Sequence, residues 1–258
     1  MSTLTIYWWS YQGLVQKQIR RFARSWVQNL LPSVVTAGLF MLIFGHFVGR
    51  DLGRTGGAPY ADFIMPGLVM FAVVTNAYNN TTLAFFGARL QRHIEELLVA
   101  PMPAWLIVAG FVTASVLRGL LAGGLVLLLA LPFTELHLHD PATALGIAVV
   151  SATLFAFAGL INGVFARSFD DTSVIATFLL TPLTYLGGVF YPVDALPAPW
   201  DRLSLANPMV YIVDGFRHGL LDAGAAHPPL IFAALLAVTA ATGALAWWLV
   251  ARGIRIKP

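Results

Sequence analysis

The sequence predicts an all-α integral membrane protein with six transmembrane helices. Of its 258 residues, 58% are apolar and only 10% are charged, and the mean hydropathy of +0.78 is far above that of soluble proteins. A spanning helix needs roughly 20 mostly apolar residues, and clusters of Gly, Pro and Asp separate six such runs. The expected spans are 27–48, 63–86, 104–131, 142–166, 173–190 and 229–251. Residues 27–258 are therefore predicted to form a single transmembrane domain.

The segment before the first span, residues 1–26, is predicted to contain a basic amphipathic helix. One helical stripe carries the apolar residues Val15, Ile19, Phe22 and Trp26. The opposite stripe carries Lys17, Arg20, Arg21 and Arg24. Such a helix suits the headgroup level of the cytoplasmic membrane surface. It either anchors the topology alone or also contacts a cytoplasmic partner.

Lysines and arginines are distributed unevenly between the two sets of connections. The set that includes both termini carries ten of them, and the other set carries four. The positive-inside rule puts the richer set in the cytoplasm, so both termini are expected there. Because these residues gather at segment ends rather than on one face, the net charge of +3 does not indicate nucleic-acid binding.

The passage 178–221 follows the fifth span and is expected on the outer side. It breaks at Gly187-Gly188 and becomes Pro-rich, too polar to span the membrane and too apolar to be a free loop. Backbone groups at membrane depth need protein or a water-filled cavity around them, because hydrocarbon cannot satisfy their hydrogen bonds. This passage is therefore interpreted as part of a translocation pathway.

The sequence lacks groups that many membrane enzymes and ion-coupled carriers use. None of the 12 Asp and Glu residues lies in an expected span, which disfavours an intramembrane acid–base or coupling-ion site. There are no cysteines, and neither Lys17 nor Lys257 follows a Gly-rich nucleotide-binding loop. Any nucleotide energy must come from another polypeptide. The His-Leu-His-Asp pattern at 137–140 is interpreted as a solvated loop, so no metal site is predicted.

Polar residues inside the spans concentrate in the second helix. Asn76, Asn79 and Asn80 lie at i, i+3 and i+4 and share one face. Burying three amides against lipid is costly, so this face should meet protein or water. It either lines a cavity or bonds neighbouring helices together. Arg118, near the middle of the third span, is expected to have a structural role with a polar partner.

The connection between the second and third spans, residues 87–103, predicts a short amphipathic helix that Pro101 ends. Its apolar face carries Leu90, Ile94, Leu97 and Leu98. Its other face carries Arg92, Glu95 and Glu96. This helix either lies along the membrane surface or protrudes as a lever that a cytoplasmic protein could push.

Three motifs resemble those of ABC-2 type transporter permeases, the membrane subunits of ABCG-like exporters. The outer passage reads Gly-Gly-Val-Phe-Tyr-Pro at 187–192, followed by Leu196-Pro197, Asn207-Pro208, Tyr211 and Arg217. The cytoplasmic connection reads Ile-Glu-Glu-Leu-Leu-Val-Ala-Pro at 94–101, preceded by Arg92. The third motif is Phe-Ala-Arg-Ser-Phe-Asp-Asp at 165–171. Because the motifs occur in order on six spans, the resemblance covers the whole chain.

The resemblance implies a bacterial inner-membrane exporter in which two copies of this chain, embedded in membrane lipid, pair with two copies of a separate ABC ATPase. ATP and Mg would be bound by that ATPase, so this chain would hold no cofactor and would not be an enzyme. The implied coupling residues are Arg89, Arg92, Glu95, Glu96 and Leu97. The implied interface helix carries Lys17, Arg20, Arg21 and Arg24.

The resemblance also implies a substrate pathway and an outer gate. The pathway residues would be Asn76, Asn79, Asn80, Thr181, Thr184 and Tyr185. The gate would be a pair of re-entrant helices near 193–205 and 208–221, with Gly187, Gly188, Pro192, Asn207, Pro208 and Tyr211. The substrate would be a drug, lipid or glycan. An ATP-independent carrier, a membrane enzyme and a purely structural subunit remain the alternatives.

Overall fold

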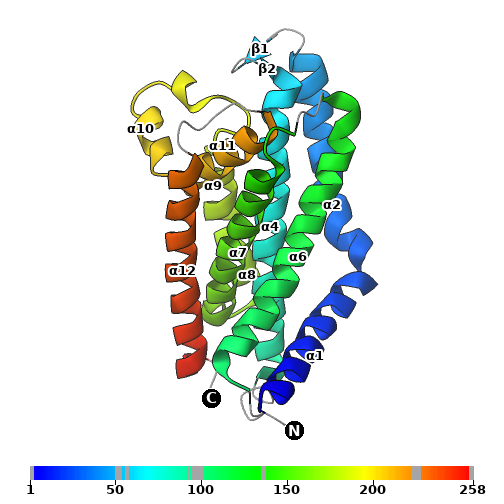
Figure 1. Cartoon of the computed structure of the whole chain (residues 1–258), viewed down its shortest axis with the longest axis vertical. Helices are drawn as coiled ribbons and strands as arrows, with labels where there is room; N and C mark the ends of the chain where they lie inside the picture. Colours follow the sequence, from blue (N-terminus) through cyan, green and yellow to red (C-terminus); the bar gives the residue numbers. More distant parts are fainter. Residues whose placement is uncertain are drawn as a thin grey trace.

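The chain forms a bundle of long α-helices in the computed structural model (Figure 1), which describes residues 3–49, 54–55, 58–91, 93–94, 102–134, 138–221 and 228–255. The long helices are α1 (Thr3–Arg24), α2 (Trp26–Phe40), α4 (Tyr60–Leu90), α6 (Ala104–Ala130), α7 (Pro141–Phe165) and α12 (Pro228–Arg252). The shorter ones are α8 (Phe169–Ile175), α9 (Thr181–Tyr185), α10 (Trp200–Leu205) and α11 (Pro208–Leu221). Two-residue strands, β1 (Arg54–Thr55) and β2 (Ala58–Pro59), pair antiparallel.

Five helices within the described residues are long and apolar enough to cross a membrane. They are Trp26–Gly45, Tyr60–Leu90, Ala104–Phe133, Pro141–Phe165 and Pro229–Arg252. They correspond to the first four expected spans and the sixth, and they confirm a helical membrane protein. The second of them begins earlier than expected and includes Asp62, which is buried. Asp62 lies in the first turn of α4, one residue before the expected span 63–86.

The fifth expected span, 173–190, is a shorter helix. α8, a π-helical segment (Ala176–Leu180) and α9 form one continuous helix, residues 169–185. At 1.5 Å per residue this helix is about 25 Å long, less than the roughly 30 Å of a hydrocarbon core. Ser168 starts it early by accepting a 3.2 Å hydrogen bond from the Asp171 N–H. Gly187 and Gly188 follow its end, and Gly188 has a φ of +72°, which favours glycine.

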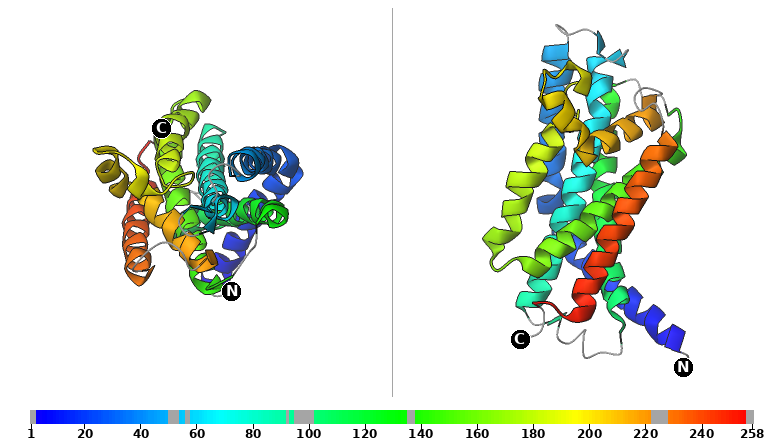
Figure 2. Two further views of the ribbon diagram at one scale, coloured as in Figure 1. Left: turned by 90° about the horizontal axis from the view of Figure 1, so that it is seen from above. Right: turned by 90° about the vertical axis from the view of Figure 1, so that its left-hand side faces the viewer.

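α4 is the central helix of the bundle. In its most apolar window 83% of the residues are buried, against 17% for α2 and α12, which lie on opposite sides of it (Figure 2). α4 packs along α6 and α7, where glycines allow the backbones to approach closely. A Cβ on Gly159 of α7 would lie 2.4 Å from the Tyr78 carbonyl oxygen, and one on Gly123 of α6 would lie 2.3 Å from Val73.

The start of α1 and the end of α12 lie at the same end of the bundle, and the passage after α9 lies at the opposite end (Figure 1). Part of that passage differs from the expected helix 193–205. It contains a 3-10 turn (Val193–Ala195) and then α10, because Pro197 and Pro199 interrupt helix formation between them. The expected helix 208–221 matches α11. α1 and α2 meet at Ser25, and the division into 1–26 and 27–258 stays a prediction.

Candidate functional site

A hydrogen-bonded cluster around Arg118 joins α2, α4 and α6. The Arg118 Nη1 donates to Asn80 Oδ1 at 2.9 Å, and Nη2 lies 3.5 Å from Asn76 Oδ1 and 3.4 Å from a backbone carbonyl oxygen of α2. Asn76 and Asn80 donate in turn to the hydroxyls of Ser33 and Ser115, both at 2.8 Å. Asn76 and Asn80 are only 4% and 5% exposed. Their side chains therefore hydrogen-bond to the neighbouring helices rather than line an open pathway.

Asn79, by contrast, lies on a partly exposed stripe of α4. Phe71, Thr75 and Asn79 are half-buried and Leu83 is exposed, at successive steps of four residues. We call these four residues the α4 stripe. It lies between α2, which the neighbouring Asn76 contacts, and α9, whose Tyr185 ring stacks 6.2 Å from the Phe71 ring.

Of the three expected pathway residues on helix 169–185, Tyr185 reaches the α4 stripe. Thr184 is buried and donates to the Leu180 carbonyl oxygen at 2.7 Å. Thr181 donates to the Ala176 carbonyl oxygen at 3.0 Å, across the π-helical segment. The two threonine hydroxyls are thus bonded within their own helix.

Arg217 of α11 fastens the outer passage to α4. Its side chain is deeply buried and forms a 2.7 Å ion pair with Asp214. Its Nη2 donates to the Gly188 carbonyl oxygen at 2.9 Å, and its Cζ lies 4.0 Å from the centre of the Phe63 ring. Sequence reasoning treated Arg217 only as a topology charge and a motif position. The spacing of three residues from Asp214 was the signal for a helical ion pair.

The hinge and the turn of the expected gate pack against each other. Asn207 caps α11 by accepting a 2.9 Å hydrogen bond from the Met209 N–H, and Pro208 occupies the first helical position. The Asn207 Nδ2 also donates to the Leu183 carbonyl oxygen at the end of α9. A Cβ on Gly187 would lie 2.6 Å from the Met209 Cβ, so this contact requires glycine.

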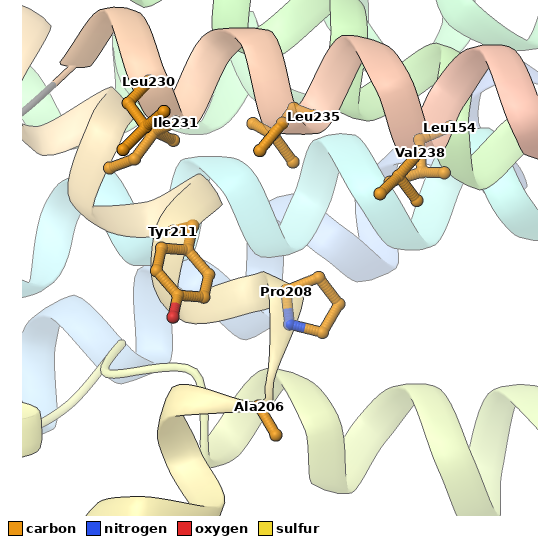
Figure 3. Close-up of a pocket in the computed structure, with 9 residues that line it drawn as sticks. Leu154, Ala206, Pro208, Tyr211, Leu230, Ile231, Leu235 and Val238 are labelled. Atoms are coloured by element: carbon orange, nitrogen blue, oxygen red, sulfur yellow. The ribbon is translucent and has the colours of Figure 1, made fainter.

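Tyr211 connects α11 to α10 through a 2.7 Å hydrogen bond from its hydroxyl to the Leu205 carbonyl oxygen. Its ring lines an apolar cavity of about 410 Å³. Figure 3 shows Tyr211 and Pro208 on one side of this cavity and Leu230 and Leu235 of α12 on the other. Pro192 directly precedes the 3-10 turn of the passage.

The connection 87–103, expected in the cytoplasm, is described only in part. Four expected coupling residues lie outside the described residues: Arg92, Glu95, Glu96 and Leu97. Arg89 lies in the last turn of α4, where its guanidinium donates to the carbonyl oxygens of Val164 and Ala166 at the end of α7. Helix C-termini leave such carbonyls without helical partners, so Arg89 joins α4 to α7.

α1 is a helix, as expected, and leans along α6. Leu14 packs on Gly110, where a Cβ would come within 2.5 Å of the leucine side chain. Tyr11 donates to the Thr113 hydroxyl at 2.9 Å. The four basic residues of the expected interface helix, Lys17, Arg20, Arg21 and Arg24, are exposed.

Histidines and carboxylates do not form a metal site within the described ranges. No three His, Asp or Glu side chains gather there where an ion could bind. His139 of the pattern at 137–140 lies beside His218 of α11, with ring centroids 5.8 Å apart. Residue 137 lies outside the described residues.

These features define a helical membrane protein with several candidate spans. The α4 stripe lies on its central helix, and at one end a passage is held in place by hydrogen bonds of Asn207 and Arg217. Residues 10–221 match the ABC-2 type transporter family, and the chain belongs to this family. It is therefore a membrane transport permease of the ABC type, which confirms the resemblance. Membership of the family implies an ABC ATPase partner.

Two similar proteins extend the match to nearly the whole chain. The chain is 47% identical to the inner membrane transport permease YadH of Escherichia coli (strain K12) over 250 residues, 96% of this chain and 97% of that protein. It is 29% identical to nodulation protein J of Sinorhizobium fredii over 220 residues, 83% of this chain and 82% of that protein.

Proposed function

We propose that this chain is the membrane subunit of an ATP-driven exporter in the bacterial inner membrane. The observation that carries the proposal is the α4 stripe, a partly exposed surface on the central helix of an ABC-2 family member that carries Thr75 and Asn79 among apolar side chains. The name of the similar permease YadH supports the inner-membrane location. ATP and Mg would be bound by the partner ATPase, since neither lysine of this chain follows a Gly-rich loop.

The coupling to the ATPase would run through the connection 87–103 and α1. Arg92, Glu95, Glu96 and Leu97 would contact the ATPase, and the basic face of α1 would lie beside it with Lys17, Arg20, Arg21 and Arg24. Arg89 would act differently from a contact residue. Because its guanidinium is bonded to the end of α7, it would transmit a movement of the connection to both α4 and α7.

A second copy of the chain would enclose the pathway. Exposed apolar side chains lie on the two helices that flank the α4 stripe. They are Val27, Leu31, Val35 and Leu39 on α2, and Phe178 and Leu179 on helix 169–185. Packing of these faces between two copies would turn the two stripes inward, where polar groups can meet water or substrate. Asn79, Thr75 and Tyr185 would contact the substrate, while Asn76, Asn80 and Arg118 would hold α4 in place.

The outer passage would gate this pathway as a re-entrant segment above it. Gly187 and Gly188 would be the hinge after α9, and Asn207-Pro208 the turn before α11. The bonds of Asn207 to α9 and of Arg217 to Gly188 support a closed gate that moves as one unit with the end of helix 169–185. Pro192 and Tyr211 would shape its two ends.

The chemistry of the stripe supports an amphiphilic substrate of the drug, lipid or glycan class. It combines one amide and one hydroxyl with aromatic and aliphatic side chains and carries no charge. Charge counting supports cytoplasmic termini, so movement toward the outer passage would be export.

Co-purification and reconstitution test the proposal. The tagged chain, co-expressed with an ABC ATPase from the same organism, is expected to purify with that ATPase. Proteoliposomes of the complex should move a fluorescent lipid analogue only with ATP. An ATP-independent carrier would instead rely on Asp62, the buried carboxylate of the described spans. Movement that persists without ATP and is abolished by Asp62→Asn would favour that second function.

A further inference from the structure

A small polar cavity lies between α1 and the last turns of α4, apart from the α4 stripe and the outer passage. Its volume is about 170 Å³, enough for several water molecules at about 30 Å³ each. Lys17, Gln18 and Arg21 of α1 line one side, and Gly87 and Gln91 line the other. No Asp or Glu of the described residues lines this cavity.

The positive charges at the cavity lack a carboxylate partner within the described part of the chain. Lys17 and Arg21 are four residues apart and lie on one face of α1, and neither forms an ion pair with a described residue. Clustered like charges without a counter-ion favour the binding of an anion.

Gln18 adds a second requirement that a ligand of this cavity has to meet. Its Oε1 atom is buried and has no hydrogen-bond partner among the described residues. A buried acceptor without a partner is costly, and a bound group can supply the missing donor. A ligand that satisfies the whole cavity therefore carries an anionic oxygen for Lys17 and Arg21 and a hydroxyl for Gln18.

The cavity lies beside the last turns of a candidate span, where lipid headgroups are expected. α4 ends at Leu90, one turn beyond Gly87, so the cavity lies at the edge of a candidate span. The adjoining α1 exposes Trp8, Trp9 and Ile19, as helices at the membrane surface do. Anionic lipids give the cytoplasmic surface a negative potential that attracts basic segments.

We propose that this cavity binds the phosphate of an anionic membrane lipid with a hydroxylated headgroup. Lys17 and Arg21 hold the phosphate oxygens, and the Gln18 Oε1 accepts from a headgroup hydroxyl. The lipid joins α1 to α4, so the anchoring of the N-terminal helix depends on the lipid composition. This lipid site is separate from any transported substrate and does not require ATP.

Binding of phosphatidylglycerol to the purified full-length chain tests the site. Native mass spectrometry would count retained lipids, with phosphatidylcholine as the neutral comparison. The double variant Lys17→Gln/Arg21→Gln is expected to bind phosphatidylglycerol about thirtyfold more weakly, because each basic residue at the surface contributes a roughly five- to sixfold attraction. The matched control Arg20→Gln/Arg24→Gln removes the same charge from the same helix outside the cavity. We expect it to retain the one tightly bound lipid.

A second variant keeps the charges and fills the space. Gly87 lines the cavity, and a Cβ on it would meet nothing within 4 Å, so Gly87→Leu places its first side-chain atom in open space. It should abolish the tightly bound lipid while the chain remains folded. An equal loss of bound lipid in the two double variants would overturn the site. Full retention of the lipid by Gly87→Leu would overturn it as well. If the chain retains inorganic phosphate but no phosphatidylglycerol, the assignment of a lipid to this cavity would be overturned. If Lys17→Gln/Arg21→Gln no longer co-purifies with the ATPase but still binds the lipid, the cavity would contact a protein instead of a lipid.

Discussion

The Arg217 guanidinium donates a 2.9 Å hydrogen bond to the backbone carbonyl oxygen of Gly188, 29 residues earlier in the chain. Gly188 adopts a φ of +72° at the break after α9, and Arg217 lies on α11. One side chain thus ties the break after α9 to α11, the last helix of the passage 178–221. The same guanidinium lies over Phe63 of α4, which attaches the passage to the central helix.

Replacing Arg217 by Met should destabilise the protein by about 2–3 kcal/mol. A fully buried pair costs about 3–5 kcal/mol when one partner is removed, and the one-third exposure of the Asp214 side chain reduces that penalty. The midpoint of thermal unfolding in detergent measures the change. Arg202→Met, at an exposed position on α10, is the control and should leave the midpoint nearly unchanged. Equal midpoints for the two variants would contradict the clamp.

Gly159→Ala should destabilise the bundle by about 1–3 kcal/mol, the usual cost of overpacking. The added Cβ would lie 2.4 Å from the Tyr78 carbonyl oxygen, a backbone atom of α4 that cannot move alone. Gly124→Ala is the control, because its Cβ meets nothing within 4 Å. It should be neutral or more stable by up to about 1 kcal/mol, through helix propensity. Chemical denaturation compares them, and a stable Gly159→Ala would refute close α4–α7 packing.

Asn79→Leu should lower substrate-stimulated ATP hydrolysis by about two- to tenfold, the value of one hydrogen bond to substrate. The side chain lies on the half-buried α4 stripe, and a leucine fits there without burying a polar group. The amount of protein in the membrane should stay the same. Unchanged stimulation would argue that the stripe is not the pathway.

Asn80→Leu should act through stability, by about 1–3 kcal/mol. It removes the acceptor for Arg118 and the donor to Ser115, both within the buried cluster. Membrane abundance and unfolding midpoint should fall, while the protein that remains keeps its substrate-stimulated hydrolysis per molecule. The reverse result, normal abundance with lost stimulation, would move Asn80 into the pathway.

Reversing two charges in the cytoplasmic connection tests the proposed coupling. Glu95→Lys with Glu96→Lys should reduce stimulated ATP hydrolysis at least about tenfold, because like charges placed at an interface cost several kcal/mol. Membrane insertion should be normal, since neither residue lies in a described span. Full hydrolysis by the assembled complex would show that the ATPase does not use these carboxylates.

The sequence alone predicted much of this fold, because membrane spans depend on local composition. Hydropathy and breakers placed α2, α4, α6, α7 and α12, and the 3.6-residue period placed α1. The Gly187-Gly188 pair also marked the break after helix 169–185, but the packing of Gly187 against Met209 of α11 is a contact that no local pattern contains.

For the candidate site, too, some features follow from the sequence and others only from the tertiary structure. The sequence by itself determined that the protein is a helical membrane protein and that α4 carries polar residues, since residue type and spacing are sufficient for both. Only the tertiary structure decided that Asn76 and Asn80 bond to neighbouring helices while Asn79 stays half-open. It also decided that Arg217 holds Gly188. Hydrogen bonds between segments far apart in the chain depend on where neighbouring helices lie, and helical periodicity does not determine that position.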